Sequence, residues 1–245
     1  MPWVYLAPHF DDIALSCGGL AWEQAQAGER VFIWTICGAG PPARELSAFA
    51  RRLHTRWKTS PETVDQRRLE DQAACQVLGA GYRYFELPDC IYRPGGKESI
   101  YYYASEEAIF GELHPGETPL IAELAHTLAQ ALPEDAQVVC PLGLGGHVDH
   151  RLTRVAAELP GRPLWYYADY PYVLVDAPQL ERLEREGWGW QRFPLVDRSV
   201  EVWQEAIAAH ASQISTFWSG LESMAADLRA YSKCEKGIRL WRLPV

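Results

Sequence analysis

The chain has 245 residues, of which 48% are hydrophobic and 22% charged, an ordinary composition for one large globular domain with a sizeable core. Its formal net charge of −9 argues against nucleic acid or an anionic membrane as the main partner, because both repel an acidic protein. No stretch approaches 18 consecutive apolar residues, and no basic segment precedes a long apolar run at the N-terminus, so we expect neither a membrane span nor a secretory signal.

Strand and helix patterns alternate along the first part of the chain. Short runs rich in apolar, β-branched or aromatic residues predict strands at 4–8, 30–37 and 82–87. Helices are predicted between them at 20–27 and 61–78. The second helix has Ser60 as its expected N-cap, Pro61 in its first turn and Gly79 at its end.

Residues 89–118 interrupt this alternation. They contain Pro94, Gly95, Gly96, Pro115 and Gly116, and we interpret them as a loop insertion over one edge of the domain, either a lid or a packed surface excursion. The alternation then resumes, with strands predicted at 136–142, 164–168, 188–193 and 239–243. Helices are predicted at 119–132, 147–159, 179–186, 200–213 and 221–230.

Strands that alternate with helices are typical of an α/β fold with a mostly parallel central sheet and helices on both faces. No repeat or linker divides the sequence, so we expect residues 1–245 to form a single domain. The six cysteines are scattered and form no CxxC pair, which favours reduced, buried thiols and a cytoplasmic protein.

Two polar clusters stand directly after predicted strands. His9-Phe10-Asp11-Asp12 follows the first strand, and His147-Val148-Asp149-His150 follows the strand at 136–142. Open α/β sheets place their binding sites at the carboxyl ends of strands. Each cluster alone is better explained as a helix cap or a surface turn. Two clusters at equivalent positions favour one shared site.

The residue types in these clusters suit metal-dependent hydrolysis. A catalytic zinc ion typically has three protein ligands, such as two histidines and a carboxylate, and keeps one position for water. The metal lowers the pKa of that water from about 15.7 toward about 7. A second carboxylate can accept the proton as the water attacks, and a further histidine can stabilise the oxyanion or protonate the leaving nitrogen.

The sequence resembles the LmbE / PIG-L family of metal-dependent N-deacetylases. That family carries a His-Pro-Asp-Asp motif after its first strand and a His-x-Asp-His motif later, which the two clusters match. The Gly18-Gly19 pair stands at the expected position downstream. Softer matches are Arg67-x-x-Glu70 and His210-x-Ser212-Gln213. The resemblance covers most of the chain and implies a Rossmann-like fold.

The resemblance also implies roles for single residues. His9, Asp12 and His150 match the zinc ligands, and Asp11 matches the general base. The same ligands would accept Fe²⁺ or another divalent ion.

Three further positions match residues around the metal. His147 matches the histidine that assists the oxyanion and the leaving group, and Asp149 matches the carboxylate that orients this histidine. Arg67 matches a substrate-binding arginine, although the adjacent Arg68 could take that role. We expect His114 and His126 to lie at the surface or in the core, outside the site.

The chain departs from the family pattern in three places. Phe10 replaces the usual proline, and Ile13 replaces an acidic residue. Some relatives have a tyrosine two residues before the assisting histidine, where this chain has Gly145. Backbone N–H groups of Gly145 and Gly146 are the substitutes that we predict for substrate and oxyanion binding.

The resemblance implies a hydrolase that removes an N-acyl group, acetyl in the first instance, from an amino sugar or glycoconjugate. The departures leave open another N-acyl or ester substrate. A non-catalytic ligand-binding relative is disfavoured, since binding alone needs neither Asp11 nor His147. The expected partner is a small, N-acylated, sugar-like molecule, and the sequence leaves open whether the chain forms a homo-oligomer.

Overall fold

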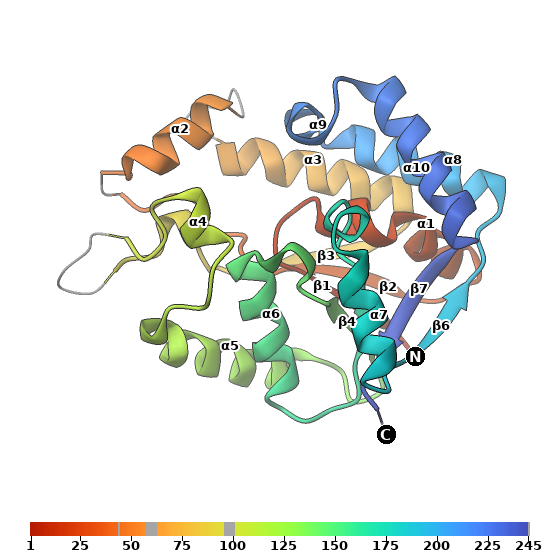
Figure 1. Ribbon diagram of the computed structural model, residues 1–245, viewed down its shortest axis with the longest axis horizontal. Coiled ribbons are helices and arrows are strands. Elements are labelled where there is room, and N and C mark those ends of the chain that lie inside the picture. Colours follow the sequence, from red (N-terminus) through yellow and green to blue (C-terminus); the bar gives the residue numbers. More distant parts are fainter. Residues whose placement is uncertain (44, 57–62, 96–100, 245) are drawn as a thin grey trace.

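The computed structural model describes residues 1–43, 45–56, 63–95 and 101–244 (Figure 1). Within these residues one sheet contains the strands β1 (Trp3–Ala7), β2 (Val31–Thr35), β3 (Gly81–Tyr84), β4 (Gln137–Pro141), β5 (Trp165–Tyr167), β6 (Gly189–Phe193) and β7 (Ile238–Arg242). The α-helices are α1 (Asp12–Gln26), α2 (Ala48–Arg56), α3 (Thr63–Leu78), α4 (Glu106–Ile109), α5 (Thr118–Ala131), α6 (Val148–Glu158), α7 (Ala177–Arg185), α8 (Asp197–Ala209), α9 (Ala211–Phe217) and α10 (Leu221–Glu235). Short 3₁₀ turns are η1 (Cys90–Tyr92), η2 (Pro115–Glu117), η3 (Leu144–Gly146) and η4 (Tyr172–Leu174).

The sheet has the order β3-β2-β1-β4-β5-β7-β6. Strands β1 to β5 run parallel, and β7 and β6 extend the β5 edge in antiparallel pairs. All seven predicted strands are present, and the mostly parallel sheet is confirmed. The order reverses between β1 and its neighbour β4, which makes their carboxyl ends the point where open α/β sheets bind ligands.

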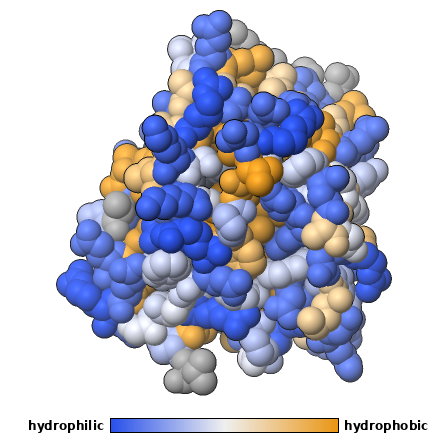
Figure 2. All heavy atoms as spheres, turned by 90° about the vertical axis from the view of Figure 1, so that its right-hand side faces the viewer, coloured by the Kyte–Doolittle hydropathy of each residue, from blue (hydrophilic) through white to orange (hydrophobic). Residues whose placement is uncertain are grey.

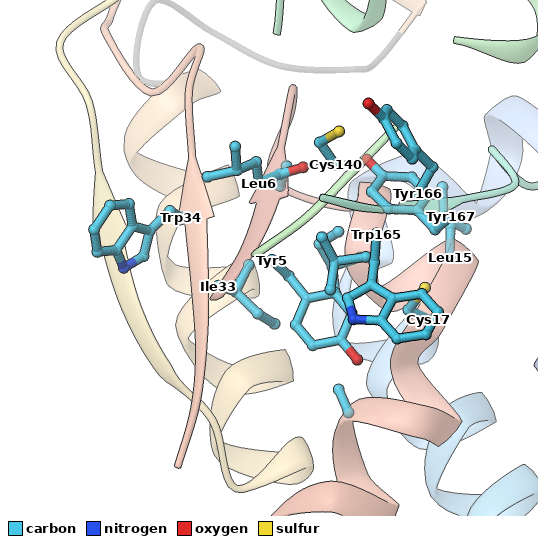
Figure 3. Close-up of a cluster of buried hydrophobic side chains, with 14 of the residues drawn as sticks. Tyr5, Leu6, Leu15, Cys17, Ile33, Trp34, Cys140, Trp165, Tyr166 and Tyr167 are labelled. Atoms are coloured by element: carbon cyan, nitrogen blue, oxygen red, sulfur yellow. Dashed lines mark hydrogen bonds between the residues drawn. The ribbon is translucent and has the colours of Figure 1, made fainter. Parts of the chain in front are cut away.

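Helices cover both faces of the sheet, as predicted. Helices α1, α3, α8 and α10 pack together on one side, and α5 packs on α6 on the other (Figure 1). Between the layers lies the core, in which side chains of β1, β2, β4 and β5 meet those of α1 (Figure 3). Strand β1 is fully buried from Val4 to Ala7, so its path toward the site is fixed by packing on both faces.

Helix α1 begins at Asp12, earlier than the predicted start at residue 20. The Gly18-Gly19 pair weakens the helical pattern in sequence but fits the tertiary packing. A Cβ atom at Gly18 would lie 2.7 Å from Cδ1 of Trp203, so the glycine allows α8 to approach α1 closely. The early start also places Asp11 and Asp12 at the helix N-terminus, beside the end of β1.

Helix α2 was not predicted, and it packs against the segment 89–118. Phe49 and Ala50 of α2 share a small apolar cluster with Ile91 and Tyr103 of that segment and with Val148 at the start of α6. The segment itself contains η1, α4 and η2, and side chains such as Ile91 and Tyr103 are buried. Of the predicted helix start, Ser60 and Pro61 lie outside the described residues.

Hydrophilic side chains cover most of the face shown in Figure 2, with apolar side chains scattered between them. None of the helices in the described ranges is long and apolar enough to cross a membrane. All six cysteines lie in the described part of the chain and none forms a disulfide. Five of them are buried, and Cys234 is exposed.

Candidate active site

The two polar clusters meet at the switch point of the sheet. The first follows β1 and opens α1, and the second follows η3 and opens α6. The ring centroids of His9 and His147 lie 5.0 Å apart, and those of His9 and His150 lie 5.5 Å apart. Together with Asp11 and Asp12, these rings line one pocket of about 370 Å³.

Asp12 lies between the two imidazoles that the sequence proposes as metal ligands. One carboxylate oxygen is 3.4 Å from Nδ1 of His9, and the other is 3.4 Å from Nε2 of His150. Two ligand atoms about 2.1 Å from a tetrahedral zinc ion are themselves about 3.4 Å apart. Each of these two contacts therefore has the spacing of two ligands on one ion, and each uses a different oxygen of Asp12.

The second ring nitrogen of each histidine is held by a buried carboxylate. Nε2 of His9 lies 3.0 Å from Oδ2 of Asp149, and Nδ1 of His150 lies 2.6 Å from Oδ1 of Asp169. Metal-binding histidines characteristically give their other N–H group to such a carboxylate, which leaves the first nitrogen free to bind. Both imidazoles are thus oriented toward Asp12.

Asp149 differs here from the sequence expectation. Its carboxylate contacts His9 and also accepts hydrogen bonds from Arg93 and from the backbone N–H of Cys90. Its link to His147 is a hydrogen bond from the Asp149 backbone N–H to Nδ1 of His147, at 3.3 Å. In this structure the Asp149 carboxylate orients His9 rather than His147.

Attraction between the histidines and the carboxylates sets the pKa values of His9, Asp12 and His150. Burial alone would lower the pKa of His9, but its hydrogen bonds to Asp12 and Asp149 raise that pKa well above its usual value. Burial opposes the charge of His150 too, and Asp12 and Asp169 raise its pKa in spite of this. The pKa of Asp12 is lowered against its own burial, chiefly by His150. The cluster therefore attracts positive charge, which a divalent cation can supply in place of protons.

His147 has the opposite electrostatic setting. Burial, followed by repulsion from His9, lowers the pKa of His147 to about 3, so its ring is neutral at pH 7. The ring caps α6, and its Nδ1 accepts the backbone N–H described above. This assigns the proton to Nε2, which can donate a hydrogen bond into the pocket. Ring nitrogens of His9, His147 and His150 lie within 4.8 Å of one another, and the Asp12 carboxylate contacts the rings of His9 and His150.

Asp11 pairs with Arg67 on the wall of the pocket. Nη2 of Arg67 donates to Oδ1 of Asp11 at 2.9 Å, and both side chains are buried. The Arg67 guanidinium lies over the ring of Phe10, 5.5 Å from its centroid, so this departure from the family pattern supports the arginine. Arg68 instead donates to the carbonyl of Gly38 at 2.6 Å. Of the two arginines, Arg67 is the one that lines the site.

Gly145 and Gly146 do not offer the free backbone donors that the sequence analysis expected. The N–H of Gly145 donates to Oδ2 of Asp176 at 3.3 Å, and that of Gly146 donates to the carbonyl of Gly143 at 3.2 Å. Both glycines have positive φ and line a neighbouring pocket instead. The turn at η3 uses these N–H groups to hold its own shape.

The motifs Arg67-x-x-Glu70 and His210-x-Ser212-Gln213 are joined by hydrogen bonds next to the pocket. Glu70 of α3 accepts hydrogen bonds from the backbone N–H and the hydroxyl of Ser212, at 3.1 and 2.7 Å. Gln213, which follows, lines the pocket. His114 and His126 are exposed and lie outside the pocket, as expected.

Four residues at the site were not singled out from the sequence. Asp89 and Tyr172 line the pocket, Asp169 holds His150, and Arg93 holds Asp149. Asp89 and Asp169 each follow the end of a parallel strand, β3 and β5. The rule that identified the two clusters could therefore have found these two aspartates as well.

Comparisons with known proteins show which family the chain resembles in sequence and fold. Residues 4–159, which include both clusters, match the PIG-L family, described as GlcNAc-PI de-N-acetylase. The 2′-N-acetylparomamine deacetylase of Streptomyces fradiae is 30% identical over 210 residues, which cover 82% of this chain and 68% of that protein. The enzyme of the same name from Niallia circulans is 28% identical over 204 residues, 76% of this chain and 71% of that protein.

Solved structures show the same fold. The zinc-inhibited form of teicoplanin deacetylase Orf2 aligns with a TM-score of 0.80 at 24% identity, covering 99% of this chain and 97% of that one. The family match and the shared fold both extend across the strands that carry the two clusters. The chain belongs to the PIG-L family of N-deacetylases.

Proposed function

We propose that this protein uses a divalent metal ion, zinc in the first instance, to hydrolyse the N-acetyl group of an amino sugar or glycoconjugate. The observation that carries the proposal is the placement of Asp12 3.4 Å from a nitrogen of His9 and of His150, each ring held from behind by a buried carboxylate. Relatives named as 2′-N-acetylparomamine deacetylases supply the class of substrate.

His9, Asp12 and His150 would hold the metal. Two imidazole nitrogens and one carboxylate suit zinc and also accept Fe²⁺. When bound there, the ion supplies Lewis acidity, which makes water more acidic and polarises the acyl carbonyl.

The remaining residues move protons and bind charge. Asp11 accepts the proton of the attacking water, and its contact with Arg67 at 2.9 Å holds the carboxylate in one orientation. His147 presents its Nε2–H to the acyl oxygen as negative charge develops there, which also assists departure of the amine. The proton taken by Asp11 balances the one that the leaving nitrogen needs.

The outer part of the pocket suits a sugar. Asp89 and Arg67 offer charged groups for hydroxyls, and Ile91, Ile109 and Phe110 form an apolar wall. A few polar groups in a mostly apolar pocket are typical of small-molecule sites. Apolar side chains of this kind can pack on the apolar face of a sugar ring.

The function is tested by measuring metal content together with amine release. Purified protein is analysed for bound metal and assayed with N-acetylglucosamine, N,N′-diacetylchitobiose and 2′-N-acetylparomamine. We expect about one divalent ion per chain and amine release that a chelator abolishes and zinc restores. Bound metal without release from these substrates would redirect the search to other N-acyl compounds or esters, or to a binding role. Absence of metal after reconstitution would contradict the proposal.

The carboxylate behind His150 provides a separate test of the metal site. Asp169→Asn removes the charge that orients this ring and should weaken zinc binding by about 10–100-fold. Competition with a chromophoric chelator measures the zinc Kd. Asp227→Asn is the control, because that carboxylate contacts the indole N–H of Trp218 and lies outside the pocket. An unchanged Kd in Asp169→Asn would remove Asp169 from the metal site.

A further inference from the structure

The loop after β5 fills the space beside Gly145. A Cβ atom at Gly145 would lie 2.5 Å from Cδ1 and 2.6 Å from Cγ of Tyr172, so the ring of Tyr172 occupies the place of a side chain at position 145. Gly145 has φ +75°, which residues with a side chain rarely adopt. The ring of Tyr172 can therefore lie where it does only because residue 145 is a glycine.

Tyr172 presents its ring to the metal-ligand cluster. It lines the same pocket as Asp11 and His147, and its ring centroid lies 6.1 Å from that of His150, edge to face. Tyr170, two residues earlier, also borders the pocket, but its ring packs against Trp218 and Tyr231. Of these two tyrosines, only Tyr172 has its ring against the histidine cluster.

The side chain of Tyr172 is partly exposed in the pocket, and no hydrogen bond of its hydroxyl is found among the described residues. A hydroxyl that borders a pocket and is not engaged within the fold can donate to a ligand there. A phenol is protonated at neutral pH, and it can donate without a change of charge. The backbone N–H groups of Gly145 and Gly146 donate within the fold, so they do not supply the oxyanion donor that the sequence analysis expected there.

The loop that carries Tyr172 is tied to the metal site. The backbone N–H of Val173 donates to the carbonyl of Asp169 at 2.9 Å, and the Asp169 carboxylate binds both His150 and the backbone N–H of Leu144. Asp169 thus fixes Tyr172, the η3 turn and a metal-binding ring relative to one another. A donor held this way is preorganised, which is what makes oxyanion stabilisation effective.

We propose that Tyr172 is a catalytic residue whose hydroxyl donates a hydrogen bond to the acyl oxygen as that oxygen gains negative charge. The proposal rests on the proposed amide hydrolysis and adds a second donor to Nε2–H of His147. No proton is transferred to the oxygen, so the phenol acts only by stabilising charge.

Tyr172→Phe tests the hydroxyl while keeping the ring beside Gly145. Loss of one oxyanion donor should lower kcat by about 10²–10³-fold and leave KM nearly unchanged. Metal content and Tm should match those of the parent protein, because the hydroxyl has no partner within the described fold. Tyr166→Phe is the matched control: its hydroxyl donates to Glu158, away from the pocket, and kcat should stay at the parent value.

A binding measurement separates this proposal from the function on which it rests. A methylphosphonamidate of glucosamine mimics the tetrahedral adduct and carries the charged oxygens that the phenol would meet. Calorimetry should show that Tyr172→Phe binds it on the order of 10-fold more weakly than the parent, with unchanged affinity for glucosamine. Equal affinity for the analogue, or a kcat within twofold of the parent, would overturn the role of Tyr172. If the parent protein hydrolyses none of the N-acetylated sugars, the proposed function fails instead.

Discussion

We expect the Asp11→Asn protein to keep its bound metal and to release amine about 10²–10⁴-fold more slowly than the parent protein. Asp11 lines the pocket next to the ligand cluster, but its contact is with Arg67 at 2.9 Å rather than with a ligand histidine. Its removal should therefore take away proton acceptance and leave the ligands in place. Metal content by elemental mass spectrometry and kcat/KM on the best N-acetylated sugar are the two measurements.

Three variants separate the roles that Asp11 could have. Asparagine keeps an oxygen that can accept from Arg67, and alanine does not, so equal losses in both would assign the effect to proton acceptance. His150→Ala is the contrast, because it should lose metal and activity together. Loss of metal from Asp11→Asn would make Asp11 a ligand. Near-full activity in Asp11→Asn would remove it as the base.

The sheet and the position of the site could be predicted because both depend on local patterns. Short apolar runs predict all seven strands, and the rule for carboxyl ends of strands brings together two clusters separated by about 140 residues. The two clusters meet because β1 and β4 are neighbouring parallel strands in the sheet. The start of α1 was missed because the reason for Gly18-Gly19 lies in α8, far along the chain.

The hydrogen-bond partners within the site could not be predicted, since a motif gives residue types and no side-chain directions. Asp149 stands two residues after His147, yet its carboxylate reaches His9 and Arg93. The N–H groups of Gly145 and Gly146 are used by the turn itself. Such outcomes depend on which loops surround the cluster, and those loops come from distant segments.

Arg93→Met should give the largest loss of stability among these variants. Arg93 is buried to 2% exposure and pairs with both Asp149 and Glu117, whose side chains are equally buried. Removing the cation leaves two buried carboxylates without the guanidinium that neutralises them, and breaking a buried pair in this way costs about 3–5 kcal/mol. Urea unfolding of the metal-free protein measures the loss. Arg198→Met is the control: that arginine also pairs with two carboxylates but is exposed to solvent, so its replacement should leave the urea midpoint nearly unchanged.

A second substitution shows where the cost of Arg93→Met arises. Glu117→Gln in the Arg93→Met background removes one of the two stranded charges, so the double variant should be more stable than the sum of the single effects predicts. The other charge remains on Asp149, which orients His9, so the double variant should still bind zinc more weakly than the parent. Recovery of stability without recovery of zinc affinity would show that the Arg93–Glu117 pair acts on stability, while the Arg93–Asp149 pair acts on His9. An Arg93→Met protein as stable as the Arg198→Met control would show that the buried carboxylates do not need this cation.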